Sequence, residues 1–321
     1  MRITNKSMNN TMLRNLNQGL GRLDRFQQQL ATGKRVLLPS DDPASVTSIM
    51  QLKSSLVENE QYIKNVDDAY SWMDSTDTVF DSITNVLHRA RELTVYSATD
   101  SLSHSDRQTI ADEIEQLFGN VLQLANSTHG GKYLFSGQMT TTLPFHRVST
   151  DPSSEDYMQI TYQGGYRDYQ NPDNPRDLAS LNVEIGVGSE LAINAINADN
   201  RDGEVTEHLF TPVFDILHNL HHSLKTGDTG SLGTSDLAEL DVVFDQILSH
   251  RSETGAKMNR VELSRERLTD LKLNLSKLLS NARDVDVTEA IMHLKAEENV
   301  YRTALSVGAR IIQPSLVDFL R

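Results

Sequence analysis

Three closely spaced histidines are the first residues whose types could do chemistry. His218, His221 and His222 would lie on adjacent faces of a helix, and His208 stands ten residues before the first of them. Imidazole nitrogens are common zinc ligands, so this group could in principle hold a metal. The same segment carries an apolar stripe at helical spacing, made of Val213, Leu217, Leu220 and Leu224. The stripe predicts an amphipathic helix with the histidines at its solvent edge, and no metal site.

Other familiar constellations are incomplete. Gly186 and Gly188 follow a possible strand, but Leu191 stands where a dinucleotide fingerprint needs its third glycine. The chain has no cysteine, which excludes thiolate nucleophiles, disulfides and Cys-ligated zinc. It also lacks a P-loop, a Gly-x-Ser-x-Gly elbow and a His-Glu-x-x-His motif. We therefore predict a protein that has no cofactor and is not an enzyme.

Two pairs of adjacent carboxylates have simpler explanations than acid–base catalysis. The run Ser40-Asp41-Asp42-Pro43 is typical of a helix start. A carboxylate at the N-cap accepts hydrogen bonds from free backbone amides. Proline at the first helical position costs no hydrogen bond, because an amide at that position has no partner within the helix. Glu297 and Glu298 fit a solvated helix face. We expect a long helix to begin at Pro43.

Composition narrows the class of partner. The chain is 38% hydrophobic and 23% charged, which is enough apolar material for a folded core. Its formal charge of −14 would repel nucleic acid and anionic membranes. The first twelve residues contain no apolar core of a cleavable signal peptide, and no stretch resembles a membrane span. Taken alone, these features and the missing cysteines favour a cytoplasmic protein that binds neither nucleic acid nor membranes.

Both ends of the chain carry heptad stripes typical of coiled coils. Near the N-terminus the stripe consists of Leu13, Leu16, Leu20, Leu23 and Leu30, and near the C-terminus of Leu268, Leu271, Leu275, Leu278, Ile291, Leu294 and Leu305. Residues 1–38 carry a net charge of +6 and residues 284–321 a net charge of −2. We expect the two ends to pair.

The regions between the ends differ in kind. The segment from Pro43 to about Thr99 has a helical seam that includes Val66, Tyr70 and Met73, and segments 104–127 and 235–281 are candidate neighbours for it. Residues Gly130-Gly131 are expected to close a helix. Short alternating runs then indicate strands, so residues 140–205 are predicted to form a small β-rich insertion.

Two runs near the chain ends resemble the signatures of the flagellin family. The first is Leu30-Ala31-Thr32-Gly33-Lys34-Arg35-Val36 followed by Pro39-Ser40-Asp41-Asp42-Pro43-Ala44. The second is Asp284-Val285-Asp286-Val287-Thr288-Glu289-Ala290 with the closing run Gln313-Pro314-Ser315-Leu316-Val317-Asp318-Phe319-Leu320. Within the family, Gly131-Lys132-Tyr133-Leu134-Phe135-Ser136-Gly137 with Pro144-Phe145 is more similar to the subunits that join hook and filament than to filament flagellin.

The resemblance implies a mainly α protein, an elongated rod of long antiparallel helices from both chain ends. Residues 1–40 and 285–321 would form an inner assembly domain, 41–139 and 206–284 the long-helix domain, and 140–205 the β-rich outer domain. The family motif would comprise Gly33, Pro39, Ser40, Asp41, Asp42 and Pro43. We expect a structural role in the flagellum, at the junction between two helical lattices. A filament flagellin, a non-flagellar coiled-coil scaffold and an unrecognised enzyme remain as alternatives.

Partners and location also follow from the resemblance. It implies contacts with neighbouring copies, with the first hook-associated junction protein, with flagellin, and with an export chaperone on the C-terminal helices. It replaces the cytoplasmic location by export through the flagellar type III channel. As the assembly interface we predict Leu13, Leu16, Leu20, Leu23, Leu271, Leu275, Leu278, Ile291, Leu294 and Leu305. The alternative for these residues is a core buried within one monomer.

Overall fold

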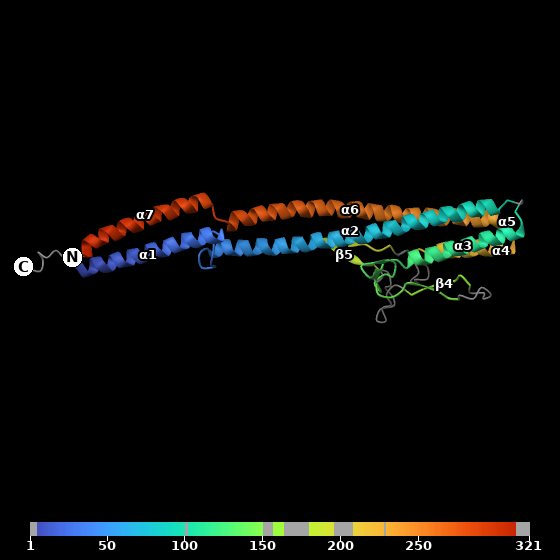
Figure 1. Cartoon of the computed structure of the whole chain (residues 1–321), viewed down its shortest axis with the longest axis horizontal. Coiled ribbons are helices and arrows are strands. Elements are labelled where there is room, and N and C mark those ends of the chain that lie inside the picture. The colour runs from blue at the N-terminus through green and yellow to red at the C-terminus, as the bar shows by residue number, and fades with distance from the viewer. Residues whose placement is uncertain are drawn as a thin grey trace, which may run out of the picture. The chain divides into compact units, whose positions relative to one another are not determined.

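The computed structural model describes residues 5–99, 102–149, 157–163, 180–195, 208–227 and 229–312. Residue contacts group the chain into two compact units. Unit 1 comprises Met1–Asn59 and Asp270–Arg321, and unit 2 comprises Glu60–Thr269. The division falls inside two long helices, α2 (Pro43–Ser97) and α6 (Leu237–Arg283), shown in Figure 1. The finer division into three domains stays a prediction.

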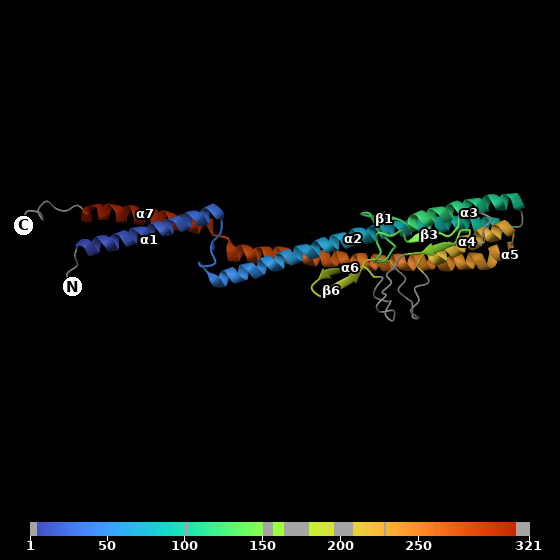
Figure 2. The ribbon, with the colours of Figure 1, turned by 90° about the horizontal axis from the view of Figure 1, so that it is seen from below.

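Unit 1 contains the paired terminal helices, α1 (Asn5–Thr32) and α7 (Val287–Ile312). They lie side by side in both ribbon views (Figures 1 and 2). Arg22 contacts Glu297, and the ring of Phe26 stacks on that of His293 with centroids 5.6 Å apart. Because residue numbers rise along α1 as they fall along α7, the two helices are antiparallel. The predicted pairing of the chain ends is confirmed.

The start of α2 follows from local sequence, as predicted. The Asp42 carboxylate accepts a hydrogen bond from the Ser45 amide at 3.1 Å and another from the Ser45 hydroxyl. Asp42 is therefore the N-cap, and Pro43 is the first helical residue. The hydrogen bonds from Ser45, with a smaller contribution from the Arg35 charge, lower the pKa of Asp42. The helix continues for 55 residues to Ser97, close to the predicted end.

Unit 2 packs its parts of α2 and α6 against α3 (His104–Ala125) and α4 (Thr211–Thr226). Before α6 come α5 (Thr229–Ser231) and a π-helical turn, Leu232–Asp236. The core contains fully buried side chains from the four long helices, among them Phe80, Phe118, Leu217 and Val261. Since these positions are far apart in sequence, burial in unit 2 depends on all four helices packing together.

The apolar seam of α2 follows the prediction except at one position. Val66 and Met73 are fully buried, but Tyr70 is 39% exposed and Ala69 is buried in its place. The small side chain of alanine lets neighbouring helices approach closely, whereas the tyrosine hydroxyl remains in contact with water. The prediction that Tyr70 belongs to the seam is therefore wrong by one residue.

Three antiparallel hairpins account for the described strands in the middle of the chain. They pair β1 (Thr128–His129) with β2 (Lys132–Tyr133), β3 (Phe145–Arg147) with β4 (Ile160–Tyr162), and β5 (Asn182–Gly186) with β6 (Ser189–Ala192). The predicted mainly helical fold with a strand-containing middle is confirmed. Residues 150–156, 164–179 and 196–205 of the predicted insertion lie outside the described residues, as does the closing run 313–321.

The prediction that Gly130 and Gly131 close a helix is wrong. Helix α3 ends at Ala125, and the two glycines form the β1–β2 turn with φ values of 57° and 80°. The cause is Asn126, which follows the last residue of α3. The Asn126 side-chain nitrogen donates to the Phe145 carbonyl at 3.0 Å, and the Phe145 backbone amide donates to the Asn126 side-chain oxygen at 3.1 Å. This exchange draws the chain toward β3 before α3 can continue.

Candidate assembly surface

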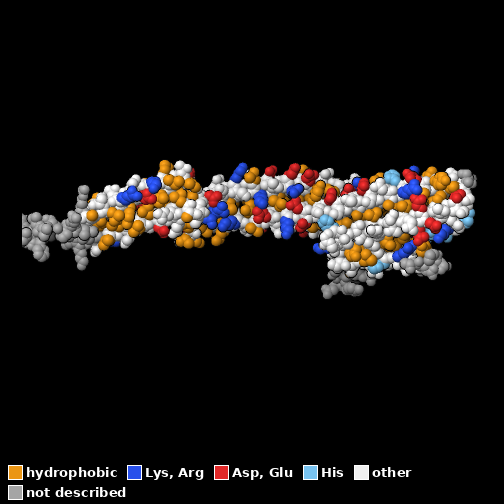
Figure 3. Space-filling view, viewed as in Figure 1, with side chains coloured by type: hydrophobic (Ala, Val, Ile, Leu, Met, Phe, Trp, Pro, Cys, Tyr) orange, Lys and Arg blue, Asp and Glu red, His pale blue; other side chains and the backbone are white. Residues whose placement is uncertain are grey.

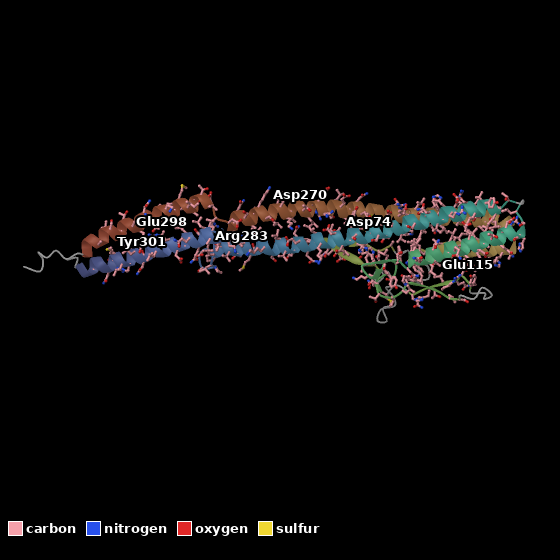
Figure 4. The ribbon with its side chains drawn as sticks, in the orientation of Figure 1. Asp74, Glu115, Asp270, Arg283, Glu298 and Tyr301 are labelled. Carbon is pink, nitrogen blue, oxygen red and sulfur yellow. The ribbon has the colours of Figure 1, made fainter. Side chains whose placement is uncertain are left out.

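The seam between α1 and α7 alternates spacings of three and four residues, as in a coiled coil. The residues facing the partner helix are Met12, Leu16, Gly19, Leu23 and Phe26 on α1 and Ala290, Leu294, Glu297, Tyr301 and Ala304 on α7. Gly19 on α1 leaves room for Tyr301 of α7, and Ala290 and Ala304 on α7 leave room for larger side chains of α1. Figure 4 marks Tyr301 and Glu298 on α7. This seam buries one stripe of each terminal helix inside unit 1.

The structure divides the ten predicted interface residues into two groups. Leu16, Leu23, Leu275 and Leu294 are partly buried within the chain itself. The exposed fraction of the other six is 54% at Leu13, 46% at Leu20, 45% at Leu271, 54% at Leu278, 46% at Ile291 and 44% at Leu305. Only the second group is available to another subunit without rearrangement.

Further apolar side chains of α7 are exposed that were not predicted as interface residues. The exposed fraction is 53% at Val287, 62% at Met292, 56% at Val300 and 50% at Val307. We call these side chains, together with Leu13, Leu20, Ile291 and Leu305, the terminal apolar surface; they lie on more than one face of α7, and Figure 3 shows apolar side chains over α1 and α7. Exposed apolar patches of this kind mark protein interaction sites. Val287 belongs to the predicted heptad stripe but is exposed at the start of α7, whereas Met292, Val300 and Val307 lie off the stripe that faces α1.

A groove of about 680 Å³ opens between α1 and α7. Met12, Leu16, Tyr301 and Val307 line it with apolar atoms. Arg22 and Glu297 also line the groove and bond to each other, with Arg22 Nε donating to Glu297 Oε1 at 2.7 Å.

Glu297 is not on a solvated helix face, which corrects that part of the sequence interpretation. Its side chain is only 17% exposed because Arg22 of α1 covers it. Glu298, by contrast, pairs with Lys295 on its own helix at 2.9 Å, and this contact lowers the pKa of Glu298. The difference arises because only Glu297 falls on the seam between the two helices.

The family-motif residues lie in the connection between α1 and α2. Gly33 adopts φ +68°, a left-handed conformation that ends α1 and favours glycine. The Asp41 carboxylate accepts hydrogen bonds from the backbone amides of Leu37 and Leu38, at 3.3 and 3.0 Å. Pro39 and Ser40 are exposed between these residues and the Asp42 cap. The motif is therefore a turn that ends one helix and starts the next.

The prediction that the histidines line a solvent edge is wrong for His208 and His221. Both are buried, whereas His222 is exposed and His218 is partly buried. Burial lowers the pKa of His208 to about 3 and, with the nearby Lys225 charge, that of His221 to about 4. Both imidazoles are therefore neutral at pH 7 and pack among aromatic rings, His208 between Phe145 and Tyr162.

Within the described ranges, no three His, Cys, Asp or Glu side chains gather closely enough to hold a metal ion. Among the described helices, none is long and apolar enough to cross a membrane.

Two family models match the ends of the chain. The model for the bacterial flagellin N-terminal helical region covers residues 3–140, and that for the C-terminal helical region covers residues 237–320. Together they span more than two thirds of the sequence. The first match includes α1, α2 and α3, and the second includes α6 and α7.

Individual relatives match along nearly the whole chain. Flagellar hook-associated protein 3 of Escherichia coli is 27% identical over 317 residues, covering 94% of this chain and 95% of its own. Polar flagellin F of Vibrio parahaemolyticus is 22% identical over 352 residues, covering 94% and 93%. The crystal structure of Bacillus cereus FlgL superposes with a TM-score of 0.55 at 25% identity, covering 72% of this chain and 99% of that one.

Proposed function

Because the chain belongs to the flagellin family, we propose that it is the structural subunit that joins the hook of the bacterial flagellum to the filament. A structural role, with no enzymatic activity, follows from the family. The observation that carries the junction role is the end-to-end match to a protein named hook-associated protein 3, which leaves only a few per cent of either chain unmatched. The sequence run 131–137 with Pro144 and Phe145 supports the same choice.

A filament flagellin is the second candidate. Its support is the match to a polar flagellin over 94% of the chain. Identity is lower there, 22% against 27%, and the alignment is longer than this chain, so it contains insertions. These differences favour the junction role.

For assembly, we propose that the terminal apolar surface contacts neighbouring copies. Its side chains are exposed in the single chain, although covering them would remove apolar area from water. Leu16, Leu23 and Leu294 would act indirectly, by holding α1 against α7 so that the surface keeps its shape. Leu271 and Leu278, exposed on α6, would extend the contact.

The further partners and the route of export are part of the same proposal. We propose the first hook-associated protein and flagellin as the neighbours on the two sides of the junction. Before assembly, the terminal apolar surface would be an aggregation hazard, which supports a chaperone on the C-terminal helices. Export would follow the flagellar type III channel, without a cleaved signal peptide.

Electron microscopy of labelled flagella tests the proposed role. Antibody raised against residues 140–205 would be applied to intact flagella of the native strain and of a strain lacking the gene. A narrow band between hook and filament, absent from the deletion strain, is the expected result. Label along the whole filament would make the chain a flagellin, and no label on intact flagella would overturn both readings.

A further inference from the structure

The connections between helices meet in unit 1 at a short two-stranded contact. Lys34 and Asp284 form an isolated antiparallel bridge. The Arg35 amide donates to the carbonyl of Arg283 at 2.7 Å, and the Val285 amide donates to the carbonyl of Gly33 at 3.0 Å. We call residues 33–36 and 282–285 the clasp. It ties the break between α1 and α2 to the break between α6 and α7.

Two backbone hydrogen bonds are too few to hold such a contact, because even a complete two-stranded hairpin is marginally stable in water. Side chains supply the rest, through the packing of Val36 with Ile49 and Leu279 and through hydrogen bonds and ion pairs. The Arg35 guanidinium donates to the carbonyl of Ala282 and to the Ser45 hydroxyl, each at 3.2 Å, and lies 3.9 Å from the Asp42 carboxylate. Arg35 thus contacts the last turn of α6 and the first turn of α2 at once.

The surroundings of Arg35 explain why arginine suits this position. The last carbonyls of a helix lack partners and carry partial negative charge, so a cation is favourable at the end of α6. The start of α2 presents Asp42, an acceptor of opposite charge. On the other side, the buried amide of Gln29 donates to the Arg35 carbonyl at 2.8 Å. Nη2 of Arg35 donates both hydrogen bonds and Nη1 faces the Asp42 carboxylate, so one side chain that stays charged serves both helix ends.

We propose that Arg35 is a positioning residue that keeps the clasp closed, and that the closed clasp sets the direction in which α1 and α7 leave α2 and α6. The second half rests on the proposed function, since a subunit between two lattices must present its terminal helices in a defined direction. The Asp284 carboxylate contributes by accepting from Arg283 and Ser280, at 2.7 and 2.8 Å. Figure 4 marks Arg283 at the end of α6.

Hydrogen exchange of the Val285 amide in the full-length protein measures clasp opening directly. The comparison is between the unaltered chain, Arg35→Met, and Arg25→Met as a control that removes an exposed arginine of α1 ten residues earlier. We expect Arg35→Met to lower protection of Val285 about five- to tenfold, the effect of losing two partly exposed hydrogen bonds. Arg25→Met should leave it unchanged. Equal protection of Val285 in all three proteins overturns the proposal.

A disulfide staple separates clasp closure from other effects of the substitution. Lys34 and Asp284 form the non-hydrogen-bonded type of antiparallel pair, since their flanking residues make the backbone bonds, so their Cα atoms lie about 4.5 Å apart. The chain has no other cysteine to interfere. Adding Lys34→Cys and Asp284→Cys to Arg35→Met should restore Val285 protection when oxidised and lose it when reduced. Failure of the oxidised staple to restore protection contradicts a role for Arg35 in closure.

The same variants in cells test the link to assembly. We expect Arg35→Met to reduce swimming and the junction label, and the staple to restore both once the protein is outside the reducing cytoplasm. If Val285 protection falls but swimming and label are normal, the clasp does not set an assembly direction. Absence of the junction label from the unaltered strain would instead overturn the proposed function, whatever the exchange result.

Discussion

Arg22 of α1 and Glu297 of α7 form a bond across the terminal helix pair, with Nε donating to Oε1 at 2.7 Å. Phe26 and His293 stack one turn further along the same seam. A polar pair and an aromatic pair thus set the register of two helices whose seam otherwise consists of apolar and small residues. Register matters here because a shift would move seam residues into the terminal apolar surface.

Replacing Glu297 should loosen α1 without affecting unit 2. Glu297→Ala leaves Arg22 without its partner, and Arg22 is half exposed, so the loss is about 0.5–1 kcal/mol. The measurement is hydrogen exchange of α1 amides in Glu297→Ala, Arg22→Met and the double variant. A coupling energy of zero in this cycle would mean that the pair does not set the register. Glu298→Ala, at the neighbouring carboxylate that pairs with Lys295 of its own helix, is the matched control.

Acid should destabilise unit 2 through its buried histidines. Above pH 6.5 His208 and His221 are neutral in both the folded and the unfolded chain. Below pH 6.5 both histidines become protonated in the unfolded chain. In the folded unit His221 stays neutral down to about pH 4 and His208 down to about pH 3. The free energy of unfolding therefore falls with falling pH, by about 1.4 kcal/mol per pH unit for each histidine. The partly buried His250, whose pKa is lowered mainly by burial, acts in the same direction.

Trp72, the single tryptophan, is buried in unit 2 and reports this unfolding by fluorescence. The urea midpoint should be measured at pH 7, 5.5 and 4.5 for the unaltered chain and for His221→Leu. The variant should have a shallower pH dependence between pH 6.5 and 4, because one proton-binding site of the unfolded chain is gone. Identical pH dependence in the two proteins would exclude His221 as a contributor. His222→Leu, at the exposed neighbour, is the control.

Truncating Phe80 should strongly destabilise unit 2. Phe80 is fully buried, and its ring centroid lies 5.9 Å from that of Phe135 and 6.1 Å from that of Phe210. Phe80→Ala leaves a cavity in this aromatic cluster and should cost about 3–5 kcal/mol. Leu263→Ala, at a side chain 67% exposed on α6, should change stability by about 0.5 kcal/mol or less. Both are read from urea unfolding of Trp72, and a small effect at Phe80 would argue against the described core.

Substitutions of exposed leucines and of partly buried leucines in the terminal helices should have different effects. Leu20→Gln and Leu305→Gln alter the terminal apolar surface, so the purified chain should keep its α1 exchange protection while incorporation into flagella falls. Leu16→Gln and Leu294→Gln should first lower the α1 protection, because they place an amide in the seam. Normal incorporation of a Leu20 and Leu305 double variant would refute the proposed contact surface.

Local features of the fold could be predicted from the sequence because their causes lie within a few residues. The Asp42 cap depends on Ser45 and Pro43, and the long helix that follows depends on an uninterrupted apolar period. The heptad stripes at both ends likewise predicted that the ends would pair. The family resemblance rested on these same local runs.

Tertiary structure alone decided which side of each helix is covered. Leu16 and Leu20 have the same side chain and lie one turn apart, yet only Leu16 faces α7. Glu297 is covered by a residue 275 positions away, and Arg35 meets Ala282 across 247 positions. His221 is buried because α4 packs on α3 and Tyr157 lies against its ring. A helical period specifies that a stripe exists, whereas burial requires a partner surface, which distant parts of the chain supply only on folding.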